Sequence, residues 1–152
     1  MTISELIGEA VRARQHARVA QSAFAVGAAI ETAGGRMFAG CNVESATYGL
    51  TVCAERVALW KALSEGEAAF LRIAVVADTA ALTPPCGACR QVLWEYCGDI
   101  EVTLANLKRK RAAYRLSELL PVPFDGRLLR PKPRKAAGLR AARATGRAVG
   151  RD

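Results

Sequence analysis

Residues 53–65 read CAERVALWKALSE, residues 71–77 read LRIAVVA, and residues 86–97 read CGACRQVLWEYC. The first and third stretches place apolar side chains at helical spacing, and each is followed by a glycine, Gly66 or Gly98, that readily ends a helix. The second stretch is a continuous apolar run rich in β-branched residues, which is typical of a strand buried on both faces. A helix, a buried strand and another helix in this order predict an α/β domain built in layers.

The flanking sequence predicts the rest of a mixed sheet. Residues 24–31 (FAVGAAIE) and 36–43 (RMFAGCNV) are strand-like runs joined by a Thr-Ala-Gly-Gly turn, which indicates an antiparallel hairpin. The other predicted elements are an amphipathic helix over residues 3–18, short strands over 101–105 and 112–116, and one helical turn over 117–120.

The net charge of +8 is confined to one end of the chain. Residues 1–125 hold 13 Lys and Arg against 13 Asp and Glu, whereas residues 126–152 hold 9 Lys and Arg against the single acid Asp152. The second segment has few large apolar side chains and cannot offset the entropy of ordering it by burial. We therefore predict a folded domain over residues 1–125 and a disordered basic tail over 126–152, with a transient helix at 136–149.

Length and composition exclude several classes of protein. A chain of 152 residues, 51% hydrophobic and 24% charged, fits one globular domain. No run approaches the roughly 20 apolar residues that a membrane-spanning helix needs. The N-terminus lacks the basic-then-apolar order of a secretory signal, and five cysteines, an odd number, argue against a disulfide framework. These features predict a cytoplasmic protein with reduced thiols.

Three of the cysteines stand at the starts of two predicted helices. Cys86 and Cys89 are three residues apart, so both thiols project from one helix face, and Cys53 opens the other helix. The partial positive charge at a helix N-terminus lowers a thiol pKa and favours the metal-binding thiolate. Thiolates are soft ligands that favour zinc over Mg²⁺ or Mn²⁺. The chain has one histidine, His16, which nearly excludes a catalytic triad or a His-rich metal site.

The number of thiols indicates a catalytic metal. A structural zinc site is normally closed by four protein ligands, whereas a catalytic site keeps a position for water. The remaining cysteines, Cys41 and Cys97, are predicted on a hairpin strand and at a helix C-terminus, away from the two helix starts. Glu55 follows Cys53 by two residues, close enough to reach a metal-bound water without being a ligand. A metal-activated water beside a carboxylate is suited to hydrolytic attack on an electrophilic carbon.

Three thiolates also raise a charge problem, because with Zn²⁺ they leave one net negative charge that opposes deprotonation of the water. Arg56 lies next to Glu55, and Arg90 follows Cys89. We hypothesise that Arg56 donates hydrogen bonds to a ligand sulfur, so that Cys53 acts more like a neutral ligand. Its loss is expected to raise the kinetic pKa or to weaken zinc binding.

A ligand-x-Glu pair followed by Pro-Cys-x-x-Cys is the signature of zinc-dependent base deaminases. Beyond this signature, residues 24–124 resemble the small homotetrameric cytidine deaminases. The matching stretches are Phe24-Ala25-Val26-Gly27-Ala28, Gly40-Cys41-Asn42-Val43-Glu44, Cys53-Ala54-Glu55-Arg56, Pro85-Cys86-Gly87-Ala88-Cys89-Arg90-Gln91, and Leu119-Leu120-Pro121 with Phe124. The resemblance implies a three-layer α/β/α domain around a mixed five-stranded sheet, with one zinc ion per subunit.

The resemblance also implies an activity and a role for each matching residue. The activity is hydrolysis of cytidine or 2′-deoxycytidine at C4 by metal-bound hydroxide, giving the uridine nucleoside and ammonia, as in pyrimidine salvage. The zinc ligands would be Cys53, Cys86 and Cys89, and Glu55 would carry the protons. Phe24, Asn42, Glu44 and Ala54 would bind the nucleoside, Asn42 and Glu44 at the ribose 3′-hydroxyl. Ala46, Tyr48 and Phe124 would reach the pocket of a neighbouring subunit.

Departures from the family pattern and two alternative functions remain. Gln21, Ala25 and Ser45 differ near the expected pocket, and residues 108–111 (KRKR) occupy what is commonly a Gly-containing turn.

One alternative is a deaminase of another aminated base or nucleoside analogue. The other is a nucleic-acid-binding module with a structural zinc, which predicts a fourth protein ligand. The basic tail is either a solvated extension or a nonspecific binding segment for nucleic acid.

Overall fold

Five strands form one mixed sheet in the computed structural model, which describes residues 1–129. The strand order is β2-β1-β3-β4-β5; β3 and β4 are parallel, and the other neighbouring strands are antiparallel. The strands are β1 (Val26–Thr32), β2 (Met37–Cys41), β3 (Phe70–Ala77), β4 (Glu101–Asn106) and β5 (Arg111–Arg115). The predicted mixed five-stranded sheet is confirmed.

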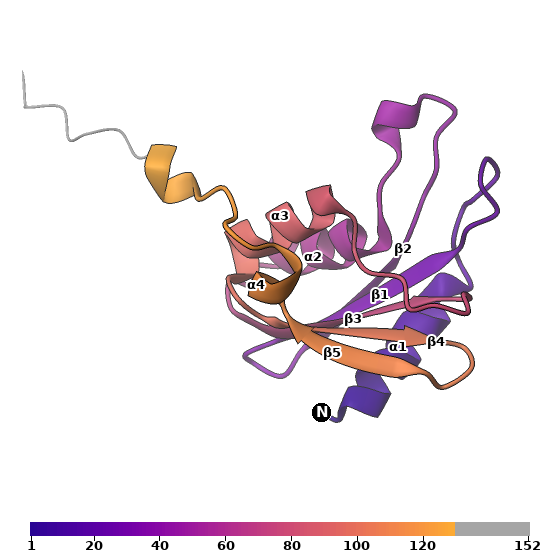
Figure 1. Cartoon of the computed structure of the whole chain (residues 1–152), viewed down its shortest axis with the longest axis horizontal. Coiled ribbons are helices and arrows are strands. Elements are labelled where there is room, and N and C mark those ends of the chain that lie inside the picture. The colour runs from indigo at the N-terminus through magenta and orange to yellow at the C-terminus, as the bar shows by residue number, and fades with distance from the viewer. Residues whose placement is uncertain (130–152) are drawn as a thin grey trace, which may run out of the picture.

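Helices cover both faces of this sheet, which confirms the predicted three layers (Figure 1). The helices are α1 (Ile3–Arg14), α2 (Ala54–Ser64), α3 (Gly87–Cys97) and α4 (Leu116–Leu119), with 3₁₀ turns η1 (Tyr48–Leu50) and η2 (Gly126–Leu129). Leu6 and Ala10 of α1 pack against Val76 of β3, while Leu59 of α2 and Leu93 of α3 lie in the larger core on the opposite face. No helix within residues 1–129 is long and apolar enough to cross a membrane.

The crossover from β3 to its parallel neighbour β4 runs through α3, and α2 lies on the same face of the sheet. Cys53 and Cys86 are the N-cap residues of α2 and α3. Ligand sites in open α/β sheets form beyond the carboxyl ends of parallel strands, where helix N-termini meet. Cys53 and Cys86, the first cysteines of the two motifs, are 33 residues apart in sequence. The fold brings both motifs to the end of the sheet where the parallel strands have their carboxyl ends.

Two predicted boundaries are wrong for local reasons. The first helix ends at Arg14 instead of continuing to residue 18, because Arg18 pairs with the extended chain at Val43. The first strand begins at Val26 instead of residue 24, because Ala23 has a positive φ of 56° and turns the chain just before it.

The predicted tail is partly described. Its first four residues form the η2 turn, and the Asp125 carboxylate just before this turn accepts a 2.8 Å hydrogen bond from the Arg127 backbone N–H. That the basic tail is disordered stays a prediction. Residues 130–152, including the transient helix predicted at 136–149, lie outside the described residues.

The close packing of α1 on the sheet depends on Gly27. A Cβ atom at this position would lie 1.9 Å from the Ala10 carbonyl oxygen, a contact that backbone cannot accommodate without moving. We expect Gly27→Ala to lower the free energy of unfolding by about 1–3 kcal/mol, as overpacking generally does. Urea denaturation of Gly27→Ala beside Gly34→Ala tests this, because a Cβ at Gly34 meets nothing closer than 3.8 Å. Equal losses in the two variants would contradict the packing argument.

Candidate metal centre and its pocket

Three thiols meet where α2 and α3 begin. Cys53 and Cys86 precede the two helices in extended conformation, and neither side chain caps its own helix, so both sulfurs are directed elsewhere. Cys89 lies in the first turn of α3 and is completely buried. The Sγ atoms of Cys53 and Cys86 are 3.9 Å apart, and all three Sγ atoms lie within 4.8 Å of one another.

This donor set fits a zinc ion. A Zn–S distance of about 2.3 Å with tetrahedral angles requires sulfurs about 3.8 Å apart, which is close to the separation of Cys53 and Cys86. Within residues 1–129 no other Cys, His, Asp or Glu joins the cluster, and neither Cys41 nor Cys97 is part of it. The prediction of a three-sulfur centre is therefore confirmed, and three protein ligands leave a coordination position for water.

The electrostatic environment gives the cysteines different pKa values. Hydrogen bonding with Cys89, together with contacts to Arg56 and Cys86, lowers the pKa of the Cys53 thiol to about 5. The pKa of Cys89 is raised, because its proton is shared with Cys53 and its side chain is buried. Burial raises the pKa of Cys97 to about 12. Of the coupled pair, Cys53 is thus the thiol that ionises and Cys89 the one that keeps its proton, whereas Cys97 stays a neutral thiol outside the cluster.

Arg56 stands beside the sulfurs, as its position after Glu55 suggested. Its Nη2 atom donates to Cys53 Sγ at 3.6 Å and to the Thr51 carbonyl oxygen at 3.3 Å, while its guanidinium lies 5.7 Å from the centroid of the Trp60 ring. Its buried Nε atom has no hydrogen-bond partner in the structure. A guanidinium held in this way adds positive charge next to Cys53, the thiol whose pKa is lowered.

Glu55 is the buried carboxyl of the site. Its side chain belongs to the first turn of α2, and the residue is 5% exposed. Burial, followed by the negative charge of Cys53, raises the pKa of Glu55 to about 7. A carboxyl group with such a pKa takes up and releases a proton near neutral pH, which general acid–base catalysis requires.

A cavity of about 230 Å³ opens directly onto these groups. Phe24, Asn42 and Ala54, three of the predicted substrate-binding residues, line it together with Cys53, Glu55 and Cys86. Sequence reasoning missed six further lining residues: Val26, Thr51, Val52, Val75, Thr83 and Pro84. Four of these immediately precede the two cysteine motifs, and this adjacency was the signal that could have identified them.

The predicted ribose-binding pair is only partly in the cavity. Asn42 is buried and tied to the backbone: its amide oxygen accepts from Val26 N–H at 2.8 Å, and its amide nitrogen donates to the Phe24 carbonyl at 2.8 Å. Glu44 lies outside the cavity lining and accepts from the backbone N–H groups of Gln21 and Ser22 at 2.9 and 3.1 Å. The Ser22 hydroxyl also donates to Glu44, and this hydrogen bond lowers the pKa of its carboxyl.

The three residues predicted to serve a neighbouring subunit, Ala46, Tyr48 and Phe124, lie outside the cavity lining of their own chain. Ala46 and Tyr48 lie in the loop that carries η1, which projects from the domain in Figure 1. Tyr48 is 79% exposed and Phe124 is 51% exposed, and none of the three lines the cavity at the thiols.

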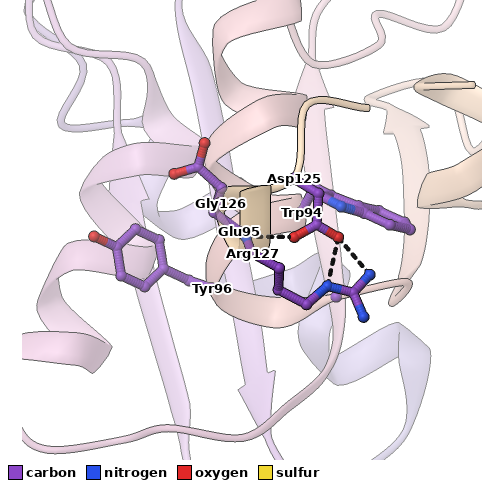
Figure 2. Close-up of a pocket in the computed structure, with 7 residues that line it drawn as sticks. Trp94, Glu95, Tyr96, Asp125, Gly126 and Arg127 are labelled. Carbon is purple, nitrogen blue, oxygen red and sulfur yellow. Dashed lines mark hydrogen bonds and ion pairs between the residues drawn. The ribbon is translucent and has the colours of Figure 1, made fainter. Parts of the chain in front are cut away.

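A second hollow, of about 560 Å³, lies at the C-terminal end of α3 against Asp125, Gly126 and Arg127 (Figure 2). Arg127 Nε donates to the Asp125 carboxylate at 2.7 Å, so this cation and anion satisfy each other. No member of the thiol cluster lines this hollow. The groups suited to chemistry are therefore in the smaller cavity.

A layered α/β fold with three thiols and a buried carboxyl at two helix N-termini defines the class of zinc-dependent deaminases. Residues 1–104 match the family model of the cytidine and deoxycytidylate deaminase zinc-binding region. A cytidine deaminase of Halalkalibacterium halodurans is 52% identical over 120 residues, which cover 78% of this chain and 91% of that protein. One of Sporosarcina psychrophila is 46% identical over 126 residues, 82% of this chain and 93% of that protein.

The fold agrees with this similarity. The crystal structure of cytidine deaminase from Burkholderia pseudomallei aligns with a TM-score of 0.79 and 46% sequence identity, over 82% of this chain and all of that chain. The chain belongs to the cytidine deaminase family, whose model is a zinc-binding region, and the cluster of Cys53, Cys86 and Cys89 is suited to hold a metal ion.

Replacing Arg56 tests its contact with the zinc site. We expect Arg56→Gln to lose zinc to a chelator about 10- to 100-fold more readily, because outer-shell hydrogen bonds to a ligand typically contribute that much to metal affinity. Zinc retained after graded chelator treatment is the measurement. Arg36→Gln is the matched control, since Arg36 is an exposed arginine paired with Glu65 and Glu67. Identical zinc retention in both variants would remove Arg56 from the site.

Proposed function

We propose that this protein hydrolyses cytidine and 2′-deoxycytidine to the corresponding uridine nucleosides and ammonia, as a step of pyrimidine salvage. The observation that carries the proposal is the placement of Glu55, Cys53 and Cys86 on one cavity, with the buried Cys89 sulfur within 4.8 Å of the other two sulfurs. Membership of the cytidine deaminase family supports the choice of substrate. A module with a structural zinc predicts a fourth protein ligand, and residues 1–129 provide none at the cluster.

In this reaction the protein's own residues transfer protons and hold the nucleoside in position. Zinc, when bound by the three sulfurs, supplies Lewis-acid activation of a water molecule. Glu55 takes one water proton and gives it to ring N3 of the pyrimidine while the water oxygen bonds to C4. Glu55 then takes the second proton from the new C4 hydroxyl and gives it to the C4 amino group. The C4–N bond breaks, ammonia leaves, and the C4–O bond becomes the carbonyl. The overall change is one water consumed, one C–N bond broken and one carbonyl formed.

Substrate orientation follows from the cavity lining. Phe24 offers an aromatic face to the pyrimidine, and Ala54, the first residue of α2, offers a backbone N–H that has no partner within the helix. Asn42 and Glu44 are assigned to the ribose 3′-hydroxyl. The hydrogen bonds that hold Asn42 and Glu44 in place keep both side chains in one orientation before substrate arrives.

The exposed aromatics support assembly as a homotetramer. Tyr48 and Phe124 are large apolar side chains open to solvent, and the cavity holding Glu55 has neither of them in its lining. We assign Ala46, Tyr48 and Phe124 to the pocket of a neighbouring subunit. The reduced state that three thiolate ligands require supports a cytoplasmic location. The basic residues after position 126 are either a solvated extension or a nonspecific binding segment for nucleic acid.

Removing the proton carrier tests the reaction. We expect Glu55→Gln to keep its fold and zinc while turnover of cytidine falls by about 10²–10⁴-fold, the usual contribution of a general acid–base group. Loss of cytidine absorbance measures the rate, and elemental analysis measures the zinc. Glu65→Gln, which changes an exposed carboxylate at the end of α2, serves as the control. A zinc-replete Glu55→Gln variant with substantial activity would refute the assignment.

Mixing two defective variants tests the shared pocket. Glu55→Gln and Phe124→Ala chains are each expected to be poorly active, because one lacks the proton carrier and the other the neighbour's ring. Assembled together at random, they should recover about a quarter of wild-type activity, since that fraction of sites combines Glu55 with a neighbour's Phe124. Glu55→Gln mixed with Cys53→Ala is the control, because both defects fall in the same site. No recovery in the first mixture would place Phe124 outside the neighbouring pocket.

A further inference from the structure

A groove of about 710 Å³ runs between α1 and the end of the β4–β5 hairpin. Ile7 and Val11 of α1 form one wall, and Ala105 with Leu107 form the apolar part of the other. Asn106, Arg109, Lys110 and Arg111 complete that second wall, and Ser4 completes the first. The groove exists because α1 packs over β1, β2 and β3 and leaves the neighbouring part of the sheet uncovered.

The rim of this groove is strongly basic. Residues 108–111 read KRKR, four of the 13 Lys and Arg in residues 1–125, and all four side chains are exposed. None of them forms an ion pair with another residue of the described part, and no acidic residue lines the groove. Four neighbouring cations without counter-charges produce a local positive potential on a body whose charges sum to zero.

The turn that carries these cations is held rigidly. Asn106 is 6% exposed, and its side-chain oxygen accepts from the backbone N–H groups of Lys108 and Lys110 at 3.0 and 2.9 Å. Its side-chain nitrogen donates to the Thr79 carbonyl at 2.9 Å, which ties the turn to the loop after β3. Because the backbone is fixed in this way, binding a ligand costs less conformational entropy than it would on a mobile loop.

Arg109 occupies a backbone conformation that normally favours glycine. Its φ is +63°, in the left-handed region, where a side chain carries a steric cost that glycine avoids. Its side chain is exposed and forms no ion pair within the described part of the chain. The charge of Arg109 is therefore available to a ligand at the rim of the groove.

The chemistry of the groove selects the type of occupant. A row of Lys and Arg fits a ligand with closely repeated negative charges, and the planar fork of Arg matches phosphate oxygens. The apolar side chains of Ile7 and Val11 on one wall and Leu107 on the other, together called the apolar wall below, fit flat apolar groups attached to such a charged chain. The surface is hollowed, whereas the flat face of an anionic membrane would contact only its rim. Residues 126–152 add nine further Lys and Arg to the same molecule.

We propose that this groove binds single-stranded nucleic acid, with the phosphates on Arg109, Lys110 and Arg111 and the bases against the apolar wall. The groove lies on the α1 face of the sheet, opposite the α2 and α3 face that carries the thiols. Occupancy of the groove therefore leaves the deaminase cavity open, and the two activities are separable.

Binding of a fluorescein-labelled oligothymidylate of about 20 nucleotides to the full-length zinc protein tests the proposal by fluorescence anisotropy. The variant Arg109→Gly/Lys110→Gln/Arg111→Gln is expected to bind at least about tenfold more weakly at low salt. The slope of the logarithm of its affinity against the logarithm of the salt concentration should become shallower by about 2. Each lost phosphate contact to a single strand removes roughly 0.7 from that slope. The deamination rate of this variant should equal that of the wild type, which verifies its fold.

A charge-matched variant separates the groove from the net charge. Arg140→Gln/Arg143→Gln/Arg147→Gln removes the same three charges from the basic segment, and we expect less than a threefold loss of affinity. An equal loss in both triple variants would overturn the proposal, since binding would then follow net charge alone. Failure of the wild type to bind the oligonucleotide would overturn it as well.

The apolar wall provides the test of ligand class. Leu107 is 42% exposed, so Leu107→Ser removes apolar contact without opening the core. We expect this variant to bind oligothymidylate about threefold more weakly and inorganic polyphosphate unchanged, because only the oligonucleotide carries bases. Equal effects on both probes would contradict base contact. Tighter binding to polyglutamate or to phosphatidylserine vesicles than to oligothymidylate would assign the groove to an acidic protein or a membrane instead.

Discussion

The site depends on one constraint: the N-termini of α2 and α3 converge beyond the carboxyl end of β3. Cys53 and Cys86 each occupy the N-cap position of a helix on the same face of the sheet, and Cys89 follows within the first turn of α3. α2 must approach the sheet closely for this to happen. Gly40 of β2 permits that approach, because a Cβ there would lie 2.6 Å from the Ala58 backbone nitrogen. A three-sulfur centre is therefore a consequence of helix packing as much as of cysteine spacing.

The same helix starts organise the charges of the site. Arg56 contacts Cys53, and Glu55 is buried next to them, so that a cation, a thiol of lowered pKa and a protonatable carboxyl lie within the four consecutive residues 53–56. Burial makes each of these charges more consequential, because the low local dielectric strengthens their interactions. The proposed proton transfer by Glu55 depends on this environment, since an exposed glutamate would stay ionised at neutral pH.

The two faces of the sheet carry different surfaces. The α2 and α3 face holds the cluster of three thiols, and the cavity beside it is lined by the exposed ring of Phe24. The α1 face ends in a groove with a basic rim at Arg109 and its neighbours. A five-stranded sheet separates them, and α1 shields only part of its own face. Catalysis and contact with a polyanion can therefore occupy one small domain without competing for the same residues.

The sequence by itself determined the layered fold, the three zinc ligands and the neighbouring carboxyl. These features are local: apolar periodicity predicts each helix and strand, and Cys86-x-x-Cys89 places two sulfurs on one helix turn. Other features depend on packing between segments that are distant in sequence, and only the tertiary structure decided these. It ended α1 at Arg14, where the chain turns to pair with Val43, and it added Thr51 and Thr83 to the cavity. It also formed the groove beside Arg109, because the extent to which α1 covers the sheet depends on the packing of the whole domain, and no short sequence pattern encodes it.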